Sequence, residues 1–529
     1  MNTSSSADRA REDGDMRQVT LWAFLLGAAG CGGGDGLDLG VADPSATRPG
    51  PVDRPGAPRR APGTPADAPY AAGDRVDLGG ADVVLVGPDF TQAGVTVAMP
   101  GDMDGDGFAE IAVSNSGWRH ESGGVRHAVN LVYGSADLEA ERILDRAETT
   151  LITPLFEFFG GDQPWLAPAG DVDGDGLADL LVGLAGSHGD VGRAYLVYGD
   201  AVRRTGEQRL EDVAVELTDG VAGGRFGARL TGVGDMNADG RGDFAIVAFG
   251  ADSAPEAARI HLYYGTRARL GHHARADVVL RDGGAAGPLG TSIAPAGNVD
   301  RDQFDDFLVT VSPSDIPHPH AYLVRGSNTA LPATALLADI ATPYNGSATI
   351  FALGGVGDLD GDELGDFLIG TMSDTVGQLF YGEPVRWRDP FTESDASAAL
   401  GAPEASAWGV VAQAGDVNGD GHGDFLIGLA NARDQRGAVH LVLGDGSRRT
   451  GGVDLATESV TFLGRATSAD DDSGAGVHDS AGASIGAGHD VNGDGLDDFV
   501  VGASGDSIGD RTGGHAYVIF GIADDAAEP

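Results

Sequence analysis

Short hydrophobic runs recur along most of the chain, each bounded by acidic segments rich in glycine. A segment of small residues such as Ser292–Gly297 precedes each acidic segment, and an apolar run such as Phe425–Gly428 follows it. An alternating run that ends in glycine comes next, as in AYLVYG to Gly199, and a further run such as SVTFL before Gly464 is visible in several units. Runs of this length and composition predict β-strands, and no helical periodicity accompanies them. The pattern therefore predicts four short strands in each repeating unit.

The acidic segment itself is the clearest repeat. Its copies begin 69, 64, 63, 60, 58 and 74 residues apart, at Asp102, Asp171, Asp235, Asn298, Asp358, Asp416 and Asp490. Seven units of four strands predict an all-β fold, a seven-bladed β-propeller of four-stranded blades. A parallel β-helix is the alternative repeat architecture, but its repeats are far shorter.

The two ends of the repeat region predict how the ring closes. The last unit has three strand-like runs and stops at Gly521, so its sheet lacks an outer strand. The N-terminal segment Val76–Gly87 resembles Val453–Gly464, the fourth run of the sixth unit. Because folded proteins cover exposed sheet edges, we expect Ala81–Val86 to pair beside Tyr517–Phe520. An N-terminal strand would thus complete the last blade.

Composition adds a strong charge imbalance. The chain has 80 acidic residues against 34 lysines and arginines, and a formal net charge of −46. Such a surface repels nucleic acid and anionic lipid headgroups and attracts cations. We therefore expect no nucleic-acid partner.

Oxygen-bearing side chains occupy positions 1, 3, 5 and 9 of every acidic loop. Alternate residues of a tight loop can converge on one hard cation such as calcium, which takes six to eight oxygen ligands. No histidine or cysteine recurs with them, which disfavours a transition metal. The candidate metal ligands are Asp102, Asp104, Asp106 and Glu110; Asp171, Asp173, Asp175 and Asp179; Asp235, Asn237, Asp239 and Asp243; Asn298, Asp300, Asp302 and Asp306; Asp358, Asp360, Asp362 and Asp366; Asp416, Asn418, Asp420 and Asp424; Asp490, Asn492, Asp494 and Asp498.

An EF-hand shares the first half of this spacing, but its position 12 is a glutamate. Position 12 is aliphatic in every copy here, namely Val113, Val182, Ile246, Val309, Ile369, Ile427 and Val501. The loops therefore lead into buried strands, and the EF-hand interpretation fails.

The unit resembles the FG-GAP repeat of integrin α-subunits and their bacterial relatives. Phe226-Gly227 and Trp408-Gly409, each ahead of an acidic loop, carry the resemblance together with the loop-strand segments, over roughly residues 82–521. The resemblance implies a seven-bladed propeller with up to seven calcium ions, bound between the first and second strands of the blades. Asn298 and Gln303 depart from the pattern in the fourth loop and Glu363 in the fifth, so we expect weaker calcium binding there, most of all in the fourth.

The N-terminal region predicts export and anchoring. An apolar run from Val19 to Gly30, too short to span a bilayer, ends at Cys31 and is typical of a signal peptide. The small residues before Cys31 resemble a bacterial lipobox, which implies lipidation of that cysteine; Met16 is an alternative start. The predicted domains are a signal peptide (1–31), a Pro/Gly/Ala-rich disordered linker (32–75), the propeller (76–522) and an acidic tail (523–529). The expected location is the cell envelope, lipid-anchored at the outer membrane or cell surface.

These features favour a monomeric, non-enzymatic binding, adhesion-like or scaffold module, with a protein or polysaccharide ligand on one propeller face. An enzyme with its active site at the propeller channel and a purely structural envelope protein are the alternatives. The segment Gly482–Gly486 fits the G-x-S-x-G nucleophile motif, but it lies on a predicted strand of a β-only repeat rather than at a strand-to-helix turn. Arg241-Gly242-Asp243 spells an adhesion tripeptide whose aspartate is a candidate metal ligand. The histidines at 272–273 and 318–320 lack a third ligand, and we expect Ser468–Ser480 to be a solvated insertion.

Overall fold

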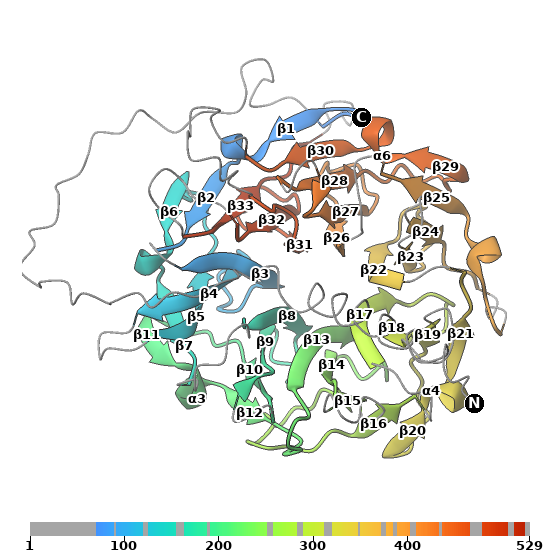
Figure 1. The fold of residues 1–529 in the computed structure, drawn as a ribbon, viewed down its shortest axis with the longest axis horizontal. Coiled ribbons are helices and arrows are strands. Elements are labelled where there is room, and N and C mark those ends of the chain that lie inside the picture. The colour runs from blue at the N-terminus through green and yellow to red at the C-terminus, as the bar shows by residue number, and fades with distance from the viewer. Residues whose placement is uncertain are drawn as a thin grey trace, which may run out of the picture. The chain divides into compact units, whose positions relative to one another are not determined.

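A computed structural model describes residues 70–88, 91–119, 125–154, 163–187, 191–250, 258–282, 289–311, 320–347, 350–371, 377–384, 389–402, 409–432, 436–465, 479–505 and 513–523. Seven twisted sheets are arranged in a ring in this part of the chain (Figure 1). This confirms the prediction of an all-β, seven-bladed propeller. Cys31, the signal peptide, the linker up to residue 69, most of Ser468–Ser480 and the tail from residue 524 lie outside the described residues.

Each blade is an antiparallel meander that starts at the centre of the ring. The innermost strands, in blade order, are β3 (Gln92–Gly101), β8 (Trp165–Gly170), β13 (Phe226–Gly234), β17 (Leu289–Gly297), β22 (Ile350–Gly357), β26 (Val410–Gly415) and β31 (Ser484–His489). The second strands are β4 (Glu110–Arg119), β9 (Asp179–Leu184), β14 (Asp243–Ala248), β18 (Asp306–Val311), β23 (Asp366–Thr371), β27 (Asp424–Leu429) and β32 (Asp498–Ala503).

Two more strands complete the four-stranded meander of each blade. The third strands are β5 (Val125–Val132), β10 (Arg193–Val197), β15 (Arg259–Tyr263), β19 (His320–Val324), β24 (Gly377–Phe380), β28 (Ala438–Val442) and β33 (His515–Ile519). The outer strands are β7 (Thr149–Ile152), β12 (Val215–Leu217), β16 (Val278–Arg281), β21 (Ala341–Tyr344), β25 (Ala398–Gly401), β30 (Val460–Leu463) and, for the seventh blade, β2 (Val83–Val86).

The seventh blade is built from both ends of the described chain. Strand β2 lies antiparallel to β33, with Val84 opposite Tyr517 and Val86 opposite His515. The Tyr70 side chain is also buried against the propeller, and its hydroxyl donates to the Phe520 carbonyl at 3.0 Å. Within the described residues, the N-terminal contacts with the propeller therefore include Tyr70, the first of them.

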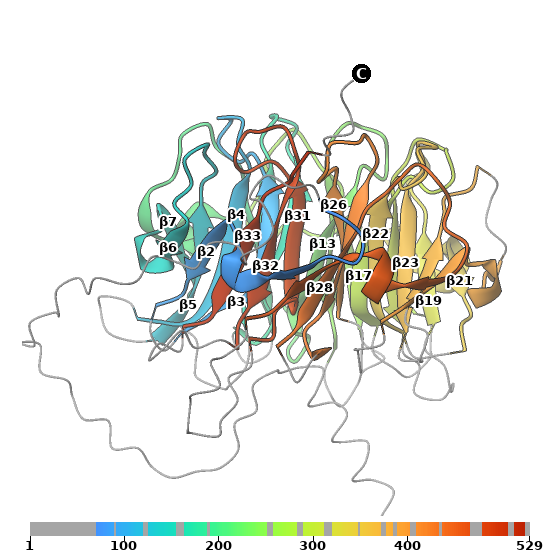
Figure 2. The ribbon, with the colours of Figure 1, turned by 90° about the horizontal axis from the view of Figure 1, so that it is seen from above.

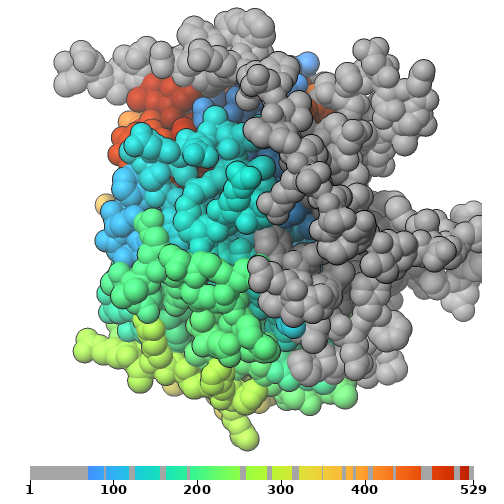
Figure 3. All heavy atoms as spheres, turned by 90° about the vertical axis from the view of Figure 1, so that its left-hand side faces the viewer, coloured from blue at the N-terminus to red at the C-terminus, as the bar shows by residue number. Residues whose placement is uncertain are grey.

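A fifth strand, which the sequence pattern did not predict, lies along the outer edge of five sheets. It runs parallel to the outer strand of one blade before the chain turns into the outer strand of the next. In the space-filling view of Figure 3, the surfaces of consecutive segments of the first blades lie directly against one another. These strands are β1 (Arg75–Asp77), β6 (Glu141–Ile143), β11 (Gly206–Arg209), β20 (Thr334–Leu336) and β29 (Gly451–Asp454).

A single helical turn follows each fifth strand and begins with a fully buried leucine. The turns are η1 (Leu78–Gly80), η2 (Leu144–Arg146), α3 (Leu210–Val213), α4 (Leu337–Ile340) and α6 (Leu455–Glu458), and a similar turn, η4 (Glu393–Asp395), precedes β25. The leucine anchors the connection in the core, so the fifth strand can link neighbouring blades and cover an edge that would otherwise be open.

The hydrophobic core consists of layers between blades. In β9, Leu180 and Val182 pack in one cluster with Leu131 of the first blade, whereas Leu181 packs in another with Phe244 of the third. Alternate side chains of a strand point to opposite faces, and both faces of β9 are covered, so all six of its residues are buried. This explains why the second strands are almost continuously apolar.

Candidate metal centre

All seven acidic loops connect the innermost strand of a blade to its second strand. Since the innermost strands share one direction, the loops emerge on one face of the ring, the upper edge in Figure 2. We number them in chain order as metal loops 1 to 7, covering residues 102–110, 171–179, 235–243, 298–306, 358–366, 416–424 and 490–498.

The first residue of each loop organises the turn. In metal loop 2, Asp171 Oδ1 accepts the backbone N–H groups of Gly174 at 2.7 Å and Asp175 at 3.1 Å, and Oδ2 accepts that of Gly176 at 2.8 Å. A carboxylate that accepts several backbone N–H groups folds the backbone around itself. This is a local reason for an acidic residue at position 1.

The ninth residue is the first of the second strand and is fully buried in every loop. In metal loop 2, Asp179 Oδ2 accepts Val172 N–H and Oδ1 accepts Gly199 N–H, both at 2.8 Å. Burial away from water raises the pKa of Asp179 to about 7, the backbone hydrogen bonds oppose this shift, and the nearby carboxylates of the loop add to it. The same causes raise the pKa of Asp306 to about 8. A nearby cation would therefore stabilise the ionised form of the position-9 carboxyl group.

Several buried oxygens of the loops have no hydrogen-bond partner. They include Oδ1 of Asp173 and of Asp360 at position 3, Oδ1 of Asn237 at the same position, and Oε1 of Glu110 at position 9. A buried oxygen without a donor is costly in a folded protein and points to an additional bound group. A cation coordinated by oxygen would satisfy these atoms.

Metal loops 1, 2 and 5 bring their carboxylates together. One oxygen from each of Asp102, Asp104, Asp106 and Glu110 lies within 4.8 Å of the others, and the same holds for the two triads Asp171, Asp173 and Asp179, and Asp358, Asp360 and Asp366. Within the described chain, the other four loops do not bring three carboxylates this close, and each of those four has an asparagine at position 1 or 3. These acidic clusters have donors and a size suited to a hard metal ion.

Metal loops 4 and 5 keep the turn despite their unusual residues. Gln303 and Glu363, at the position of the usual glycine, adopt left-handed backbone conformations with φ of 75° and 69°. Asn298 at position 1 accepts one backbone N–H, from Asp302 at 3.2 Å, because its amide nitrogen cannot accept another. The loop with the weakest predicted calcium binding therefore also has the fewest hydrogen bonds to its first residue.

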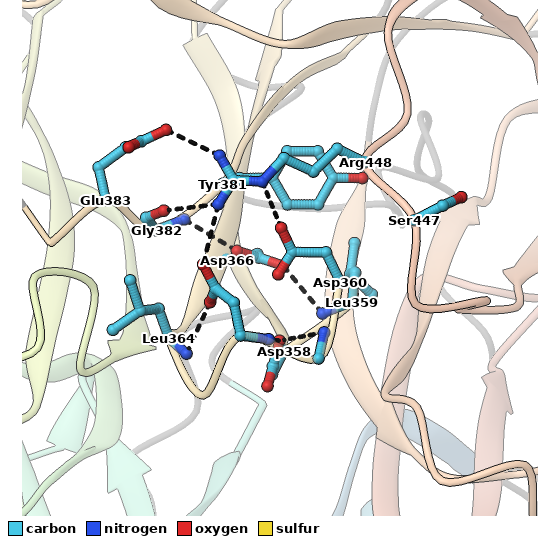
Figure 4. A network of polar contacts seen from close by, with 12 residues as sticks. Asp358, Leu359, Asp360, Leu364, Asp366, Tyr381, Gly382, Glu383, Ser447 and Arg448 are labelled. Atoms are coloured by element: carbon cyan, nitrogen blue, oxygen red, sulfur yellow. Dashed lines mark hydrogen bonds and ion pairs between the residues drawn. The ribbon is translucent and has the colours of Figure 1, made fainter.

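The arginines that contact these loops were not predicted from the sequence. In metal loop 5, Arg448 forms an ion pair with Asp360 and donates to Asp362 Oδ2 at 2.9 Å and Glu383 Oε1 at 2.8 Å, while its guanidinium lies over the Tyr381 ring (Figure 4). Arg448 lies 88 residues beyond Asp360 in the chain. In the sequence, Arg448 is marked only by its position shortly after Gly444, the glycine that follows the third strand of the next blade. This position alone is a weak basis for predicting the contact.

The other candidate motifs occupy structural positions. Ser484 begins β31, and its hydroxyl oxygen accepts the Val97 N–H at 2.8 Å across the junction of blades 7 and 1. The aspartate of the Arg-Gly-Asp tripeptide, Asp243, is fully buried at position 9 of metal loop 3. His272 Nδ1 accepts the backbone N–H of Glu216 at 3.1 Å. His318 lies outside the described residues.

Comparisons with known proteins agree with this architecture. Residues 481–519, which span β31, metal loop 7 and β33, match the family profile of the FG-GAP repeat. A stretch of 175 residues, 30% of this chain, is 32% identical to integrin alpha-PS2 of Drosophila melanogaster and spans 12% of that protein's length.

Among solved structures, BBS1N in complex with ARL6DN, soaked with mercury, matches with a TM-score of 0.39 and 11% identity over 84% of this chain and 99% of that chain. Rhamnogalacturonan lyase YesW matches with a TM-score of 0.40 and 14% identity over 82% of this chain and 73% of that chain. In the part of the chain that is described, no helix has the length and hydropathy needed to cross a membrane. The chain therefore contains an FG-GAP repeat, at residues 481–519, within an all-β seven-bladed propeller related in sequence to an integrin α-subunit.

Proposed function

We propose that this chain is a calcium-stabilised binding or scaffold module attached to the cell surface. The observation that carries the calcium proposal is the combination of converging carboxylates and buried, unpaired oxygens in the loops of one propeller face. Repulsion among these carboxylates opposes folding without a counter-ion, and calcium would remove it.

Calcium suits these loops better than other common metals. The donors are carboxylate and amide oxygens, so soft and borderline metals have no preferred ligand. Flexible loops that differ in composition accommodate the variable coordination of calcium more readily than the strict octahedron of magnesium. Asp171, Asp173 and Asp179 would hold the ion in metal loop 2, for example.

Thermal unfolding in calcium, in magnesium and in chelator tests this proposal. A site adds roughly 2.7 kcal/mol when calcium is at about 100 times its dissociation constant, so we expect a much higher Tm in calcium than in chelator and a smaller rise in magnesium. Asp171→Ala should reduce the calcium-dependent rise, whereas Asp137→Ala, at an exposed position outside the loops, should leave it unchanged. Equal Tm values of the wild type in calcium and chelator would refute calcium stabilisation.

The proposed ligand is a protein or polysaccharide that contacts one propeller face. The integrin-like sequence supports a binding role, and the strong negative charge favours a partner with cationic groups and disfavours nucleic acid. Binding of the calcium-loaded protein to arrays of extracellular proteins and polysaccharides, with loss of the signal in chelator, would support this role. A purified monomer that binds neither class in calcium would contradict it and leave a structural envelope role.

The proposed anchor is a lipid on Cys31, which rests on the sequence around that residue. The full-length protein expressed in a bacterial host should partition into detergent, and Cys31→Ala should move it to the aqueous phase. A wild-type protein that stays aqueous with residues 1–30 still attached would contradict lipid anchoring.

A further inference from the structure

The residue at position 3 differs among the metal loops, and its identity correlates with an arginine contact. The loops with aspartate at position 3 each have an ion pair between that aspartate and an arginine; the pairs are Asp104–Arg203, Asp173–Arg269, Asp300–Arg325 and Asp360–Arg448. The arginine comes from the following blade in metal loops 1, 2 and 5, whereas Arg325 directly follows β19 in the same blade as metal loop 4. The remaining loops have asparagine there, namely Asn237, Asn418 and Asn492, and no described arginine contacts these side chains. An additional carboxylate is thus always accompanied by a guanidinium.

Arg269 shows what the guanidinium does in metal loop 2. Its Nε donates to Asp173 Oδ2 at 2.6 Å, and its Nη2 donates to Asp175 Oδ2 at 3.1 Å and to the Gly199 carbonyl at 3.0 Å. Arg269 comes from the blade that follows, and its guanidinium carbon lies 4.8 Å from the centre of the Tyr198 ring. The Tyr198 hydroxyl accepts the N–H of Leu270 at 2.9 Å, which fixes the backbone next to Arg269. The arginine therefore ties positions 3 and 5 to the neighbouring blade.

This contact also directs the position-3 carboxylate. Asp173 Oδ2 is occupied by Arg269, and Oδ1 is buried without a partner. Asp360 has the same arrangement, with Oδ2 on Arg448 and Oδ1 unpaired. The guanidinium thus binds Oδ2 and leaves the buried Oδ1 for a metal.

Two of the asparagine loops, metal loops 6 and 7, reach a similar geometry without an arginine. Asn418 Nδ2 donates to Asp420 Oδ2 at 3.0 Å, and Asn492 Nδ2 donates to Asp494 Oδ2 at 2.9 Å. In both cases a donor at position 3 reaches the position-5 carboxylate directly. In metal loop 3, the position-5 residue Asp239 instead receives a donor from Arg241, at 2.6 Å.

We infer that, in metal loops 1, 2 and 5, an aspartate at position 3 together with an arginine from the following blade replaces the asparagine found at position 3 of metal loops 6 and 7, and that this arginine is a positioning residue of the metal loop. Metal loops 1, 2 and 5 then have four carboxylates and one guanidinium, and metal loops 6 and 7 have three carboxylates, so the net charge around the ion is equal. The arginine adds a link between blades that the asparagine does not provide. The link itself needs no metal, whereas its effect on calcium binding rests on the proposed function.

A double-mutant cycle on Asp173 and Arg269 tests this inference. In chelator, Arg269→Met should lower Tm, on the order of 3 °C, because Asp173 and Asp175 then face each other without a cation. In an Asp173→Asn background, the same Arg269→Met change should lower Tm by less than half as much. Arg267→Met is the matched control, since Arg267 is exposed two residues away, and it should leave Tm unchanged.

A reverse substitution checks the same idea in a loop without an arginine. Asn418→Asp places a second carboxylate beside Asp420 and should lower Tm in chelator, as Arg269→Met does. In calcium, the Asp173→Asn/Arg269→Met double variant should bind calcium as tightly as the wild type within about twofold.

The outcomes separate the two proposals. If Arg269→Met lowers Tm equally with aspartate and with asparagine at position 173, or leaves Tm unchanged in both, the inference is wrong whatever calcium does. If the coupling appears in chelator but calcium raises the Tm of no variant, calcium stabilisation is wrong and the arginine link stands.

Discussion

Ring closure makes a quantitative prediction about the N-terminus. Truncation before Tyr70 keeps every described contact of the N-terminal segment, whereas truncation after Gly87 removes β1, η1 and β2. The longer truncation deletes five buried side chains, those of Tyr70, Leu78, Val83, Leu85 and Val86. It also exposes the edges of β33 in the seventh blade and β30 in the sixth.

The expected cost follows from these side chains. Each large buried apolar side chain contributes roughly 1.5–3 kcal/mol, so the five together contribute about 8–15 kcal/mol. This is as large as the net stability of a typical domain, about 5–15 kcal/mol. A protein that starts at Tyr70 should therefore fold like the full chain, and one that starts at Pro88 should fail to fold cooperatively.

Urea unfolding of the two truncated proteins in calcium, followed by tryptophan fluorescence and circular dichroism, measures the difference. Leu85→Ala in the longer protein provides an intermediate case and should cost about 2–5 kcal/mol. Equal unfolding midpoints for the proteins that start at Tyr70 and Pro88 would show that β2 does not stabilise the ring.

Two further predictions concern the blade connections and pH. Leu337→Ala should lower the free energy of unfolding by about 2–5 kcal/mol, because Leu337 is fully buried at the start of α4. Leu336→Ala, at a neighbouring position that is 38% exposed, should change the urea midpoint little. Equal effects of the two substitutions would contradict the anchoring role of these leucines. In chelator, Tm should rise as the pH falls from about 8.5 to 6.5, because the folded state binds protons more tightly than the unfolded state in this window. The responsible groups are the buried position-9 carboxyls. Burial raises the pKa to about 7 for Asp179, Asp243, Asp366, Asp424 and Asp498, and to about 8 for Glu110 and Asp306. Below about pH 6.5, His127 and His515 should oppose this rise, since burial lowers the pKa of each to about 4; a Tm in chelator that falls from pH 8.5 to 6.5 would contradict the predicted linkage.

The repeat made the fold predictable from sequence. Each copy combines a tight acidic loop with an apolar strand, and the aliphatic residues at position 12, such as Val182, indicated that the loop leads into a buried strand. Seven such copies leave few architectures other than a propeller.

The features that the sequence analysis did not predict, the fifth strands and the arginine contacts, depend on contacts between distant parts of the chain. The fifth strands are three or four residues long and pair with the preceding blade, so no alternation of their own reveals them; the repeated leucine, as at Leu210, was the available signal. The arginine contacts join residues such as Asp173 and Arg269, 96 positions apart. An arginine in a surface loop is common, and only the position-3 residue of the preceding loop distinguishes these arginines from others.

The number of calcium ions bound per chain tests the metal loops most directly. Equilibrium dialysis of chelator-stripped protein against calcium, with metal measured by mass spectrometry, should give about seven ions per chain, or about six if metal loop 4 stays unfilled. Asp171→Ala should bind about one fewer, and Asp137→Ala should bind as many as the wild type. Fewer than about one ion per chain at millimolar calcium, or equal counts for the wild type and Asp171→Ala, would contradict the assignment of these loops as calcium sites.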